Sequence, residues 1–289
     1  MAHIFRIIIV IILLMAAAAC QPTTTPPPDA GATTAPVAQG GAPVVDLTRP
    51  PSGESISAAN ISWDRAPNTV VFRAEVAGGD MDSAFHTRND IPFCTVYGDN
   101  RVVWTISALR NDDTVVFDIV TDDTIRLFAE RLVNQQKIYT YKTGADLIAP
   151  SEVEPIYERL TLFVNGTLHQ TDSFGGWDYT YYQQSLTDCR SLSVTPVAYL
   201  PDAAWVSAQR VTYDPNRPSI SWDGAAAALP LGELADAGQP RWLTGRNVAV
   251  LWDRLRSIGS DVQFEDSTGG TYQVAVEVPN VTRSAPPAP

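Results

Sequence analysis

The chain has 289 residues and a formal net charge of −12 at pH 7, because 32 aspartate and glutamate residues outnumber 20 lysine and arginine residues. Nucleic acids bind to basic surfaces, so this balance argues against a nucleic-acid partner, whereas an acidic surface keeps an exported domain soluble.

The order of the first twenty residues is that of a signal peptide. Arg6 precedes an apolar run over residues 7–15, which is followed by four alanines and Cys20. That run is about half as long as the roughly 20 residues that a membrane-spanning helix requires. The small residues before Cys20 resemble the lipobox of bacterial lipoproteins, although Ala17 stands where that family usually has leucine.

The lipobox resemblance implies cleavage after residue 19, a lipid on Cys20 and a protein anchored to the extracytoplasmic face of the cell membrane. Ordinary secretion with cleavage at the same bond is the alternative, and it leaves a free Cys20 unexplained. In either case the mature chain functions outside the cytoplasm.

Composition divides the chain into four parts, of which the leader, residues 1–19, is the first. Residues 20–55 are rich in proline, threonine, alanine and glycine and contain no aromatic residue, which predicts a disordered tether. All seven tryptophans and ten tyrosines lie within 56–283, which predicts one folded domain, with two lobes that divide near residue 200 as the alternative. Residues 284–289 are predicted to be a short disordered tail.

Two cysteines, Cys94 and Cys189, remain when Cys20 is set aside. An even pair in a compartment that permits oxidation predicts one disulfide bond. Two buried free thiols are the alternative.

Alternating apolar and polar residues predict strands in the first half of the folded region. Residues 69–76 form one such run, and residues 95–106 form two runs around a turn at 98–100, which indicates a hairpin. Another strand is predicted at 114–120. The next residue, Thr121, can cap a helix, in which apolar residues recur at helical spacing: Ile125, Phe128, Leu132 and Val133.

The second half repeats this mixture of strands and helices. Residues 157–173 flank Asn165 and Gly166, a pair that favours the type I′ turn of a hairpin. The later elements predicted are a helix within 177–192, a strand at 206–213, a helix at 246–258 capped by Thr244 and stopped by Gly259, and strands at 262–264 and 271–278. The whole pattern predicts an α+β fold with mainly antiparallel sheet and two or three packed helices.

The segment Ile91–Trp104 reads IPFCTVYGDNRVVW. It resembles a segment of the form IPxxTxYGDGxVxx in a group of uncharacterised bacterial exported lipoproteins, and the likeness continues to the closing strand. Asn100 stands where that group usually has glycine, which the same turn accepts because asparagine tolerates a positive φ. The resemblance implies a fold and a location, and it carries no catalytic residue.

The side chains that could carry catalysis or bind a metal form no recognised motif. His86 and His169 have no carboxylate or cysteine at a metal-ligand spacing, and no Gly-x-Ser-x-Gly sequence presents a nucleophilic serine. Four acidic pairs suggest calcium binding or glycosidase chemistry, but helix capping and contact with solvent explain these residues better. The pairs are Asp80 and Asp82, Asp112 and Asp113, Asp122 and Asp123, and Glu152 and Glu154. We therefore expect no metal and no cofactor.

The most unusual local composition is the segment 174–182, where Trp177, Tyr179 and Tyr181 follow two glycines. If these aromatic side chains are exposed together, they form a binding patch for a sugar ring or a partner peptide. The alternative is a tight junction before a helix, in which the aromatic side chains fill the core.

Taken together, these features favour a membrane-anchored, non-catalytic lipoprotein of the cell envelope that binds a protein or polymer partner. The predicted tether, the acidic surface and the lack of a recognised catalytic motif support this interpretation. An envelope hydrolase that acts on wall polymer or peptide is the alternative, and it requires a cleft that joins a histidine to a serine or to two acids.

Overall fold

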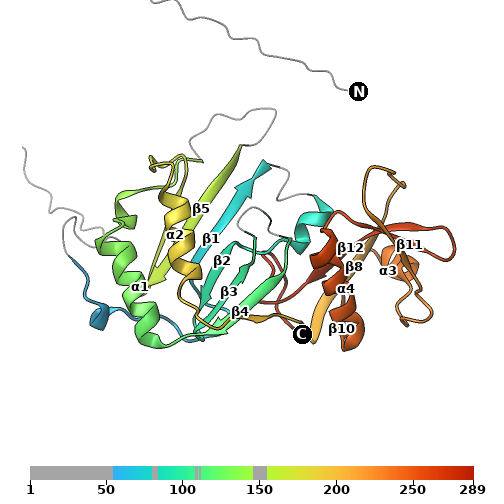
Figure 1. Ribbon diagram of the computed structural model, residues 1–289, viewed down its shortest axis with the longest axis horizontal. Coiled ribbons are helices and arrows are strands. Elements are labelled where there is room, and N and C mark those ends of the chain that lie inside the picture. The colour runs from blue at the N-terminus through green and yellow to red at the C-terminus, as the bar shows by residue number, and fades with distance from the viewer. Residues whose placement is uncertain (1–54, 80–83, 108–109, 111, 146–154) are drawn as a thin grey trace, which may run out of the picture. The chain divides into compact units, whose positions relative to one another are not determined.

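The computed structural model describes residues 55–79, 84–107, 110, 112–145 and 155–289 (Figure 1). The predicted leader, Cys20 and residues 20–54 of the predicted tether lie outside the described residues, as do Asp80, Asp82, Glu152 and Glu154. Every described residue belongs to one compact unit. None of the helices in the described ranges is long and apolar enough to cross a membrane.

Seven strands form an antiparallel sheet, here called sheet A, in the order β6-β5-β1-β2-β3-β4-β7. Its strands are β1 (Val70–Gly78), β2 (Cys94–Tyr97), β3 (Arg101–Thr105), β4 (Val115–Ile119), β5 (Ile156–Val164), β6 (Thr167–Asp172) and β7 (Val197–Ala198). Both predicted hairpins are present, and their turns place Asn100, Asn165 and Gly166 at φ values of 70°, 53° and 71°. Asparagine and glycine adopt this left-handed conformation at little cost, which is why both turns were predictable.

One face of sheet A is covered by two helices, α1 (Asp122–Asn134) and α2 (Tyr181–Arg190), which Figure 1 shows lying against its strands. Successive side chains of a strand point to opposite faces, and on this face Phe72 of β1 and Leu162 of β5 join both helices in the first core cluster. Phe72 also meets Phe128 of α1 edge to face, with ring centroids 4.9 Å apart.

Helix α1 begins where the sequence predicted. Thr121 Oγ1 accepts a hydrogen bond from the Thr124 amide at 3.2 Å, which satisfies one of the backbone donors that a helix start leaves unpaired. Asp122 and Asp123 place negative charge at the positive end of the helix dipole. The predicted apolar stripe is at most 6% exposed at each of its four positions, Ile125, Phe128, Leu132 and Val133.

Five further strands form sheet B, in the order β10-β8-β12-β11-β9. They are β8 (Ala203–Arg210), β9 (Ser219–Trp222), β10 (Arg241–Thr244), β11 (Gln263–Asp266) and β12 (Thr271–Glu277), and only the β9–β11 pair is parallel. Helices α3 (Leu231–Ala237) and α4 (Arg246–Ile258) pack on this sheet. Four apolar residues of α4 are buried, namely Val248, Leu251, Trp252 and Leu255.

The two sheets share the second core cluster. Tyr97 and Val103 of sheet A pack in the same cluster as Val276 of β12 and Trp252 of α4. The change from one sheet to the other falls between residues 198 and 203, at the position where the sequence suggested a division. Because apolar side chains of both sheets occupy one cluster, neither sheet buries its apolar surface alone.

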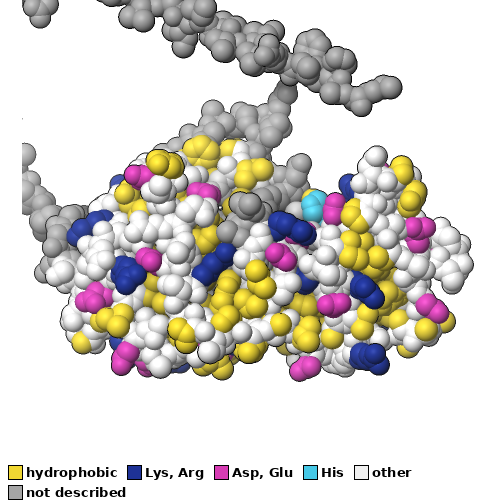
Figure 2. All heavy atoms as spheres, in the orientation of Figure 1, with side chains coloured by type: hydrophobic (Ala, Val, Ile, Leu, Met, Phe, Trp, Pro, Cys, Tyr) yellow, Lys and Arg dark blue, Asp and Glu magenta, His cyan; other side chains and the backbone are white. Residues whose placement is uncertain are grey.

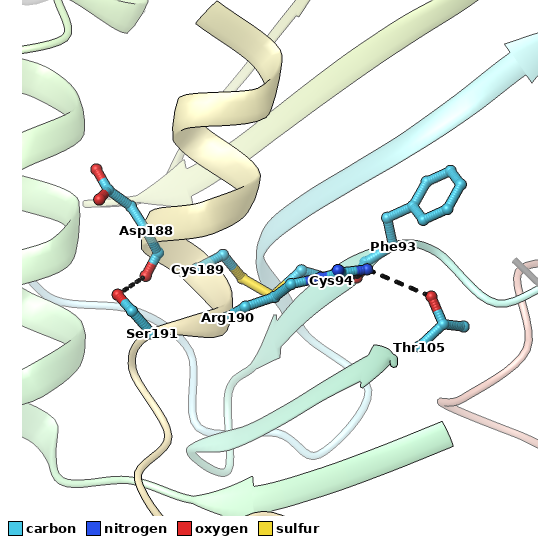
Figure 3. The surroundings of a disulfide bond; sticks show 7 residues. All are labelled: Phe93, Cys94, Thr105, Asp188, Cys189, Arg190 and Ser191. Atoms are coloured by element: carbon cyan, nitrogen blue, oxygen red, sulfur yellow. Dashed lines mark hydrogen bonds between the residues drawn. A yellow bond between two sulfur atoms is a disulfide. The ribbon is translucent and has the colours of Figure 1, made fainter. Parts of the chain in front are cut away.

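A disulfide bond joins Cys94 on β2 to Cys189 in the last turn of α2, as predicted, with their Cα atoms 6.3 Å apart (Figure 3). Both cysteines are fully buried. Beside the bond, the Arg190 guanidinium donates to the carbonyl oxygens of Ser107 at 2.8 Å and Phe93 at 3.3 Å, and burial lowers the pKa of Arg190. The cross-link and these bonds hold the end of α2 against the middle of sheet A.

Several elements of the second half differ from the sequence-based expectation. Thr244, the predicted cap of α4, is the last residue of β10, and the residue before α4 is Gly245, whose φ is 89°. The strand expected at 206–213 begins and ends three residues earlier, as β8. The sequence pattern did not predict β9, β10 or α3. Residues 284–289, predicted to be a tail, form no helix or strand, but the Pro287 carbonyl accepts a hydrogen bond from the Trp205 indole at 3.0 Å.

Candidate anion-binding site

The three aromatic residues of the predicted binding patch are not exposed together. Tyr179 is 93% exposed, whereas Tyr181 is 6% exposed, and burial raises the pKa of its phenol. Trp177 is half-buried, donates from its indole nitrogen to Thr171 Oγ1 at 2.8 Å and stacks on Tyr182. Tyr181 and Tyr182 therefore pack into the core at the start of α2, with Trp177 against them, and Tyr179 alone of the three predicted residues is fully open to solvent.

His86 and His169 lie on different elements. His86 is in the short helix η3 (Phe85–Asn89) and is half-buried. His169 is on β6, with Nε2 2.9 Å from the Ile138 carbonyl oxygen. Within the ranges that the structure describes, no three histidine, cysteine or acidic side chains gather in a way that could hold a metal ion.

The acidic pairs in the described part of the chain bind neighbouring segments of the protein. Asp112 accepts hydrogen bonds from the Ser260 amide at 2.9 Å and from Arg110 at 3.0 Å. Burial alone raises the pKa of Asp112, but these hydrogen bonds outweigh it, so the pKa is lowered. Asp122 accepts two hydrogen bonds from Arg65, at 2.7 and 2.6 Å. Each carboxylate thus links a helix end to a neighbouring segment.

A pocket of about 270 Å³ is lined mostly by charged side chains. Its lining residues are Arg73 and Glu75 of β1, Thr87 and Arg88 of η3, Arg159 of β5, and Arg283 and Ser284, which follow β12. Four of these seven residues are arginines, in a chain whose net charge is −12. Because a guanidinium is permanently charged and presents several N–H donors, this arginine pocket is suited to an anion.

Strand alternation explains why two of the arginines meet. Arg73 and Glu75 alternate along β1 with Phe72 and Ala74, which belong to the first core cluster. They therefore point to the face of sheet A opposite α1 and α2. Glu75 lies directly across from Arg159 in the β1–β5 register, which places the β5 arginine on the same face.

Hydrogen bonds from η3 close the other side of the arginine pocket. The Asn89 side chain donates to the Val274 carbonyl at 3.0 Å and accepts from the Val276 amide at 2.8 Å, so η3 is fixed to the backbone of β12. The Arg283 amide donates to the Asp90 carbonyl at 2.9 Å. These bonds hold η3 and the segment after β12 together, and Arg283 Nη2 joins them to β1 by donating to the Val76 carbonyl at 2.6 Å.

Two carboxylates hold three of the arginines. Glu75, which is 4% exposed, accepts from Nε and Nη2 of Arg159 at 3.0 and 2.7 Å and pairs with Arg283 at 3.4 Å. Glu277 of β12 accepts from Nη2 of Arg88. Such pairs compensate part of the cost of removing these charges from water.

Arg73 differs from the other three arginines. In the described part of the chain it makes no ion pair with a carboxylate, and its Nε atom is buried without a hydrogen-bond partner. It lies beside the Tyr97 phenol. Burial raises the pKa of Tyr97, although the positive charge of Arg73 acts in the opposite direction. A partly buried guanidinium without a counter-ion is costly, so a bound anion would stabilise this residue most.

A second pocket, of about 250 Å³, lies between α1 and α2. Its charged residues, Arg131 and Asp188, pair with each other at 3.2 Å, and its walls include Leu127, Phe128 and Leu192. Because the two charges compensate each other, this groove offers no charged group for a ligand. The arginine pocket remains the better candidate.

Sequence reasoning missed the arginine pocket because its residues come from four separate segments of the chain. The only local signal is a charged pair inside an apolar strand, as in TVVFRAEV at 69–76, and charged positions of an alternating strand ordinarily face solvent. The β1–β5 register and the position of η3 are needed to bring the arginines together.

No protein-family model, curated protein or solved structure matches this chain. The resemblance carried by residues 91–104 therefore stays a prediction, and the chemistry of the arginine pocket is the basis for assigning a function.

Proposed function

We propose that this chain is a lipid-anchored, non-catalytic protein of the cell envelope, which binds an anionic group of a protein or polymer partner in the arginine pocket. The observation that carries the binding role is the pocket itself: four guanidinium groups and one carboxylate line it. The order of residues 1–20, which ends in Cys20, supports the anchor.

The acidic net charge is compatible with this proposal. A net charge of −12 disfavours a broad basic surface, and the face drawn in Figure 2 shows basic and acidic side chains scattered singly. A pocket concentrates positive charge locally, and surrounding acidic groups repel anions that do not fit it. Selective binding of one anionic group is therefore expected, rather than general adhesion to polyanions.

The binding role is tested with the full chain, expressed in an export-competent bacterium and purified in detergent. Fluorescently labelled polyphosphate and poly-L-glutamate serve as anionic probes, and binding is followed by fluorescence anisotropy at low ionic strength. We expect at least one probe to bind, with an affinity that falls as salt rises. Failure of both probes to bind would contradict the proposal.

A charge-matched pair of variants assigns the binding to the arginine pocket. Arg73→Gln removes the arginine that pairs with no carboxylate among the described residues, and Arg254→Gln removes an exposed arginine of α4 that does not line the pocket. We expect Arg73→Gln to weaken probe binding about tenfold, as loss of one charge-assisted contact implies, and Arg254→Gln to bind as the parent chain does. Equal effects of the two variants would show that binding occurs elsewhere.

The anchor is tested separately by intact-mass analysis of protein purified from membranes. We expect loss of residues 1–19 and an added diacylglycerol and acyl mass on Cys20. A full-length chain without added mass would contradict the anchor and leave the binding role to its own test.

A further inference from the structure

Trp205 and Trp242 lie side by side on sheet B, on the face opposite α3 and α4. Trp205 of β8 stands between Ala204 and Val206, which belong to the second core cluster together with residues of both helices, so its side chain points to the other face. Trp242 of β10 lies directly across from Trp205 in the strand register, and the two rings meet edge to face with their centroids 5.3 Å apart. Both side chains of this tryptophan pair are half-buried.

A proline-rich segment of the same chain is hydrogen-bonded to the tryptophan pair. Residues 285–289 read APPAP, and the Trp205 indole Nε1 donates to the Pro287 carbonyl at 3.0 Å. Each of these five residues is a proline or precedes one. Proline fixes φ at about −65°, and the residue before a proline is confined to extended backbone. The segment therefore favours a polyproline II helix, whose three residues per turn place Pro286 and Pro289 on the same side.

We infer that the tryptophan pair is a docking site for a proline-rich segment of a partner protein, and that residues 285–289 occupy it as an internal competitor. Aromatic side chains bind polyproline II helices because flat rings pack against proline rings and the preformed helix loses little entropy on binding. A tryptophan adds an indole N–H that donates to a carbonyl of the ligand. This site is separate from the anion binding proposed above and extends the function to a second class of ligand.

The resident segment, residues 285–289, is held weakly enough to be displaced. Its last four residues are exposed, and among the described residues its one hydrogen bond is the bond to Trp205. A single neutral hydrogen bond contributes little net stability, because water replaces it when it breaks. What favours the resident segment is its attachment to the chain, which gives it an effective concentration on the order of millimolar.

A partner protein is a better occupant than a second copy of this chain. A second copy offers the same five residues, so its segment gains no contact over the resident one and also loses the freedom of two separate molecules. A longer proline-rich stretch of another protein can contact both Trp205 and Trp242, and the added contacts compensate for the advantage of the attached segment.

The inference is tested with the full chain and a labelled peptide that contains two APPAP repeats, whose binding is followed by fluorescence anisotropy. The decisive variant carries Pro286→Gly and Pro287→Gly, which remove the preformed extended backbone of the resident segment. We expect this double variant to bind the peptide at least about fivefold more tightly than the parent chain does, because the internal competitor is weakened. A peptide with glycine in place of every proline should bind neither protein. Equal binding of the APPAP peptide to the two proteins, or none to either, would overturn the inference.

A matched pair of tryptophan variants, each made in the double variant, assigns the binding to the tryptophan pair. Trp205→Phe keeps an aromatic ring but removes the indole donor, so we expect it to weaken peptide binding about fivefold. Trp177→Phe removes a half-buried indole that donates to Thr171 on sheet A and should leave peptide binding unchanged. Circular dichroism verifies that each variant is folded. Equal weakening by the two changes would overturn the assignment to this site.

Sedimentation velocity of the parent chain in detergent tests the alternative occupant. We expect a monomer over a wide range of protein concentration, because each chain occupies its own tryptophan pair. Dimers that dissociate when Trp205→Phe is introduced would identify a second copy as the occupant and overturn the assignment to a partner protein.

Discussion

The two faces of sheet A are built from the same strands but are stabilised in different ways. Under α1 and α2, apolar side chains such as Phe72 and Leu162 pack in the first core cluster, and the buried Cys94–Cys189 bond fastens α2 to the sheet. On the opposite face, Arg73 alternates with the apolar residues, and Glu75 and Arg159 are held by ion pairs.

The difference separates the residues that stabilise the fold from those that are available to bind a ligand. The apolar side chains of the first face need no ligand, because burial of apolar area is favourable without a partner. The charged face depends on paired charges, and Arg73 lacks a carboxylate partner within the described residues. Proteins retain such locally unfavourable groups mainly where function requires them. We therefore expect the first face to determine stability and the second to determine binding.

The largest effect should come from the cross-link on the apolar face. The double variant Cys94→Ala, Cys189→Ala opens a loop with a sequence separation of 95 residues, which by the chain-entropy argument lowers the free energy of unfolding by about 4 kcal/mol. Guanidinium chloride unfolding measures the loss. Probe binding by the folded fraction should be unchanged, because neither cysteine lines the arginine pocket. A loss below about 1 kcal/mol would show that the packing of α2 does not need the bond.

The next effect concerns the buried charge pairs of the opposite face. Glu75→Gln leaves Arg159 and Arg283 without their shared carboxylate, and we expect a loss of about 2 kcal/mol in the free energy of unfolding, since both arginines keep some contact with water. The matched control is Asp236→Asn, which breaks the exposed pair with Arg210 and should leave the free energy of unfolding nearly unchanged. Urea unfolding compares the two variants, and equal losses would mean that burial does not strengthen the Glu75 pairs.

A smaller effect is expected at the start of α1. Thr121→Ala removes the side-chain acceptor for the Thr124 amide and should lower the free energy of unfolding by about 1 kcal/mol, whereas Thr121→Ser, which keeps a hydroxyl group, should lose only part of that. Thermal unfolding monitored by circular dichroism ranks the variants. If the serine variant is as unstable as the alanine variant, the hydroxyl group is not the stabilising feature.

The smallest effect is the pH dependence of Asp122. Hydrogen bonds from Arg65 and Asn100 hold the pKa of Asp122 below its ordinary value. A lowered folded-state pKa contributes stability above the unfolded-state pKa of about 3.9, and this contribution is lost as the pH falls below it. Because the carboxyl is 39% exposed, we expect less than about 1 kcal/mol. Urea unfolding at pH 6 and pH 3 should show a stability gap between the parent chain and Asp122→Asn that shrinks at the lower pH, and a constant gap would refute the role of this charge.

Elements determined by local chemistry were predictable from the sequence. The turns at Asn100 and Asn165 require residues that tolerate positive φ, and the start of α1 requires a capping hydroxyl group. Sheet B was harder to predict, because β9 has four residues and pairs in parallel with β11, more than 40 positions later in the chain. The bounds of α4 were predicted correctly, but its cap was not, because Gly245, which makes no side-chain cap, takes the position expected for Thr244.

The candidate site, in contrast, was not predictable from the sequence. The sequence drew attention to Trp177, Tyr179 and Tyr181, but an aromatic run alone does not reveal which rings are buried, and Tyr181 proved to be in the core. Arg73 and Arg283 stand more than 200 positions apart and form no motif. They line one pocket because strand register and η3 place them there.

The sequence by itself determined the α+β class, the two hairpins, α1 and the pairing of Cys94 with Cys189, because each depends on periodicity, turn residues or the number of cysteines. Only the tertiary structure decided which aromatic rings are buried and which arginines converge. Those features depend on contacts between residues far apart in sequence, and a side chain's position in its own strand or helix does not specify what lies across from it.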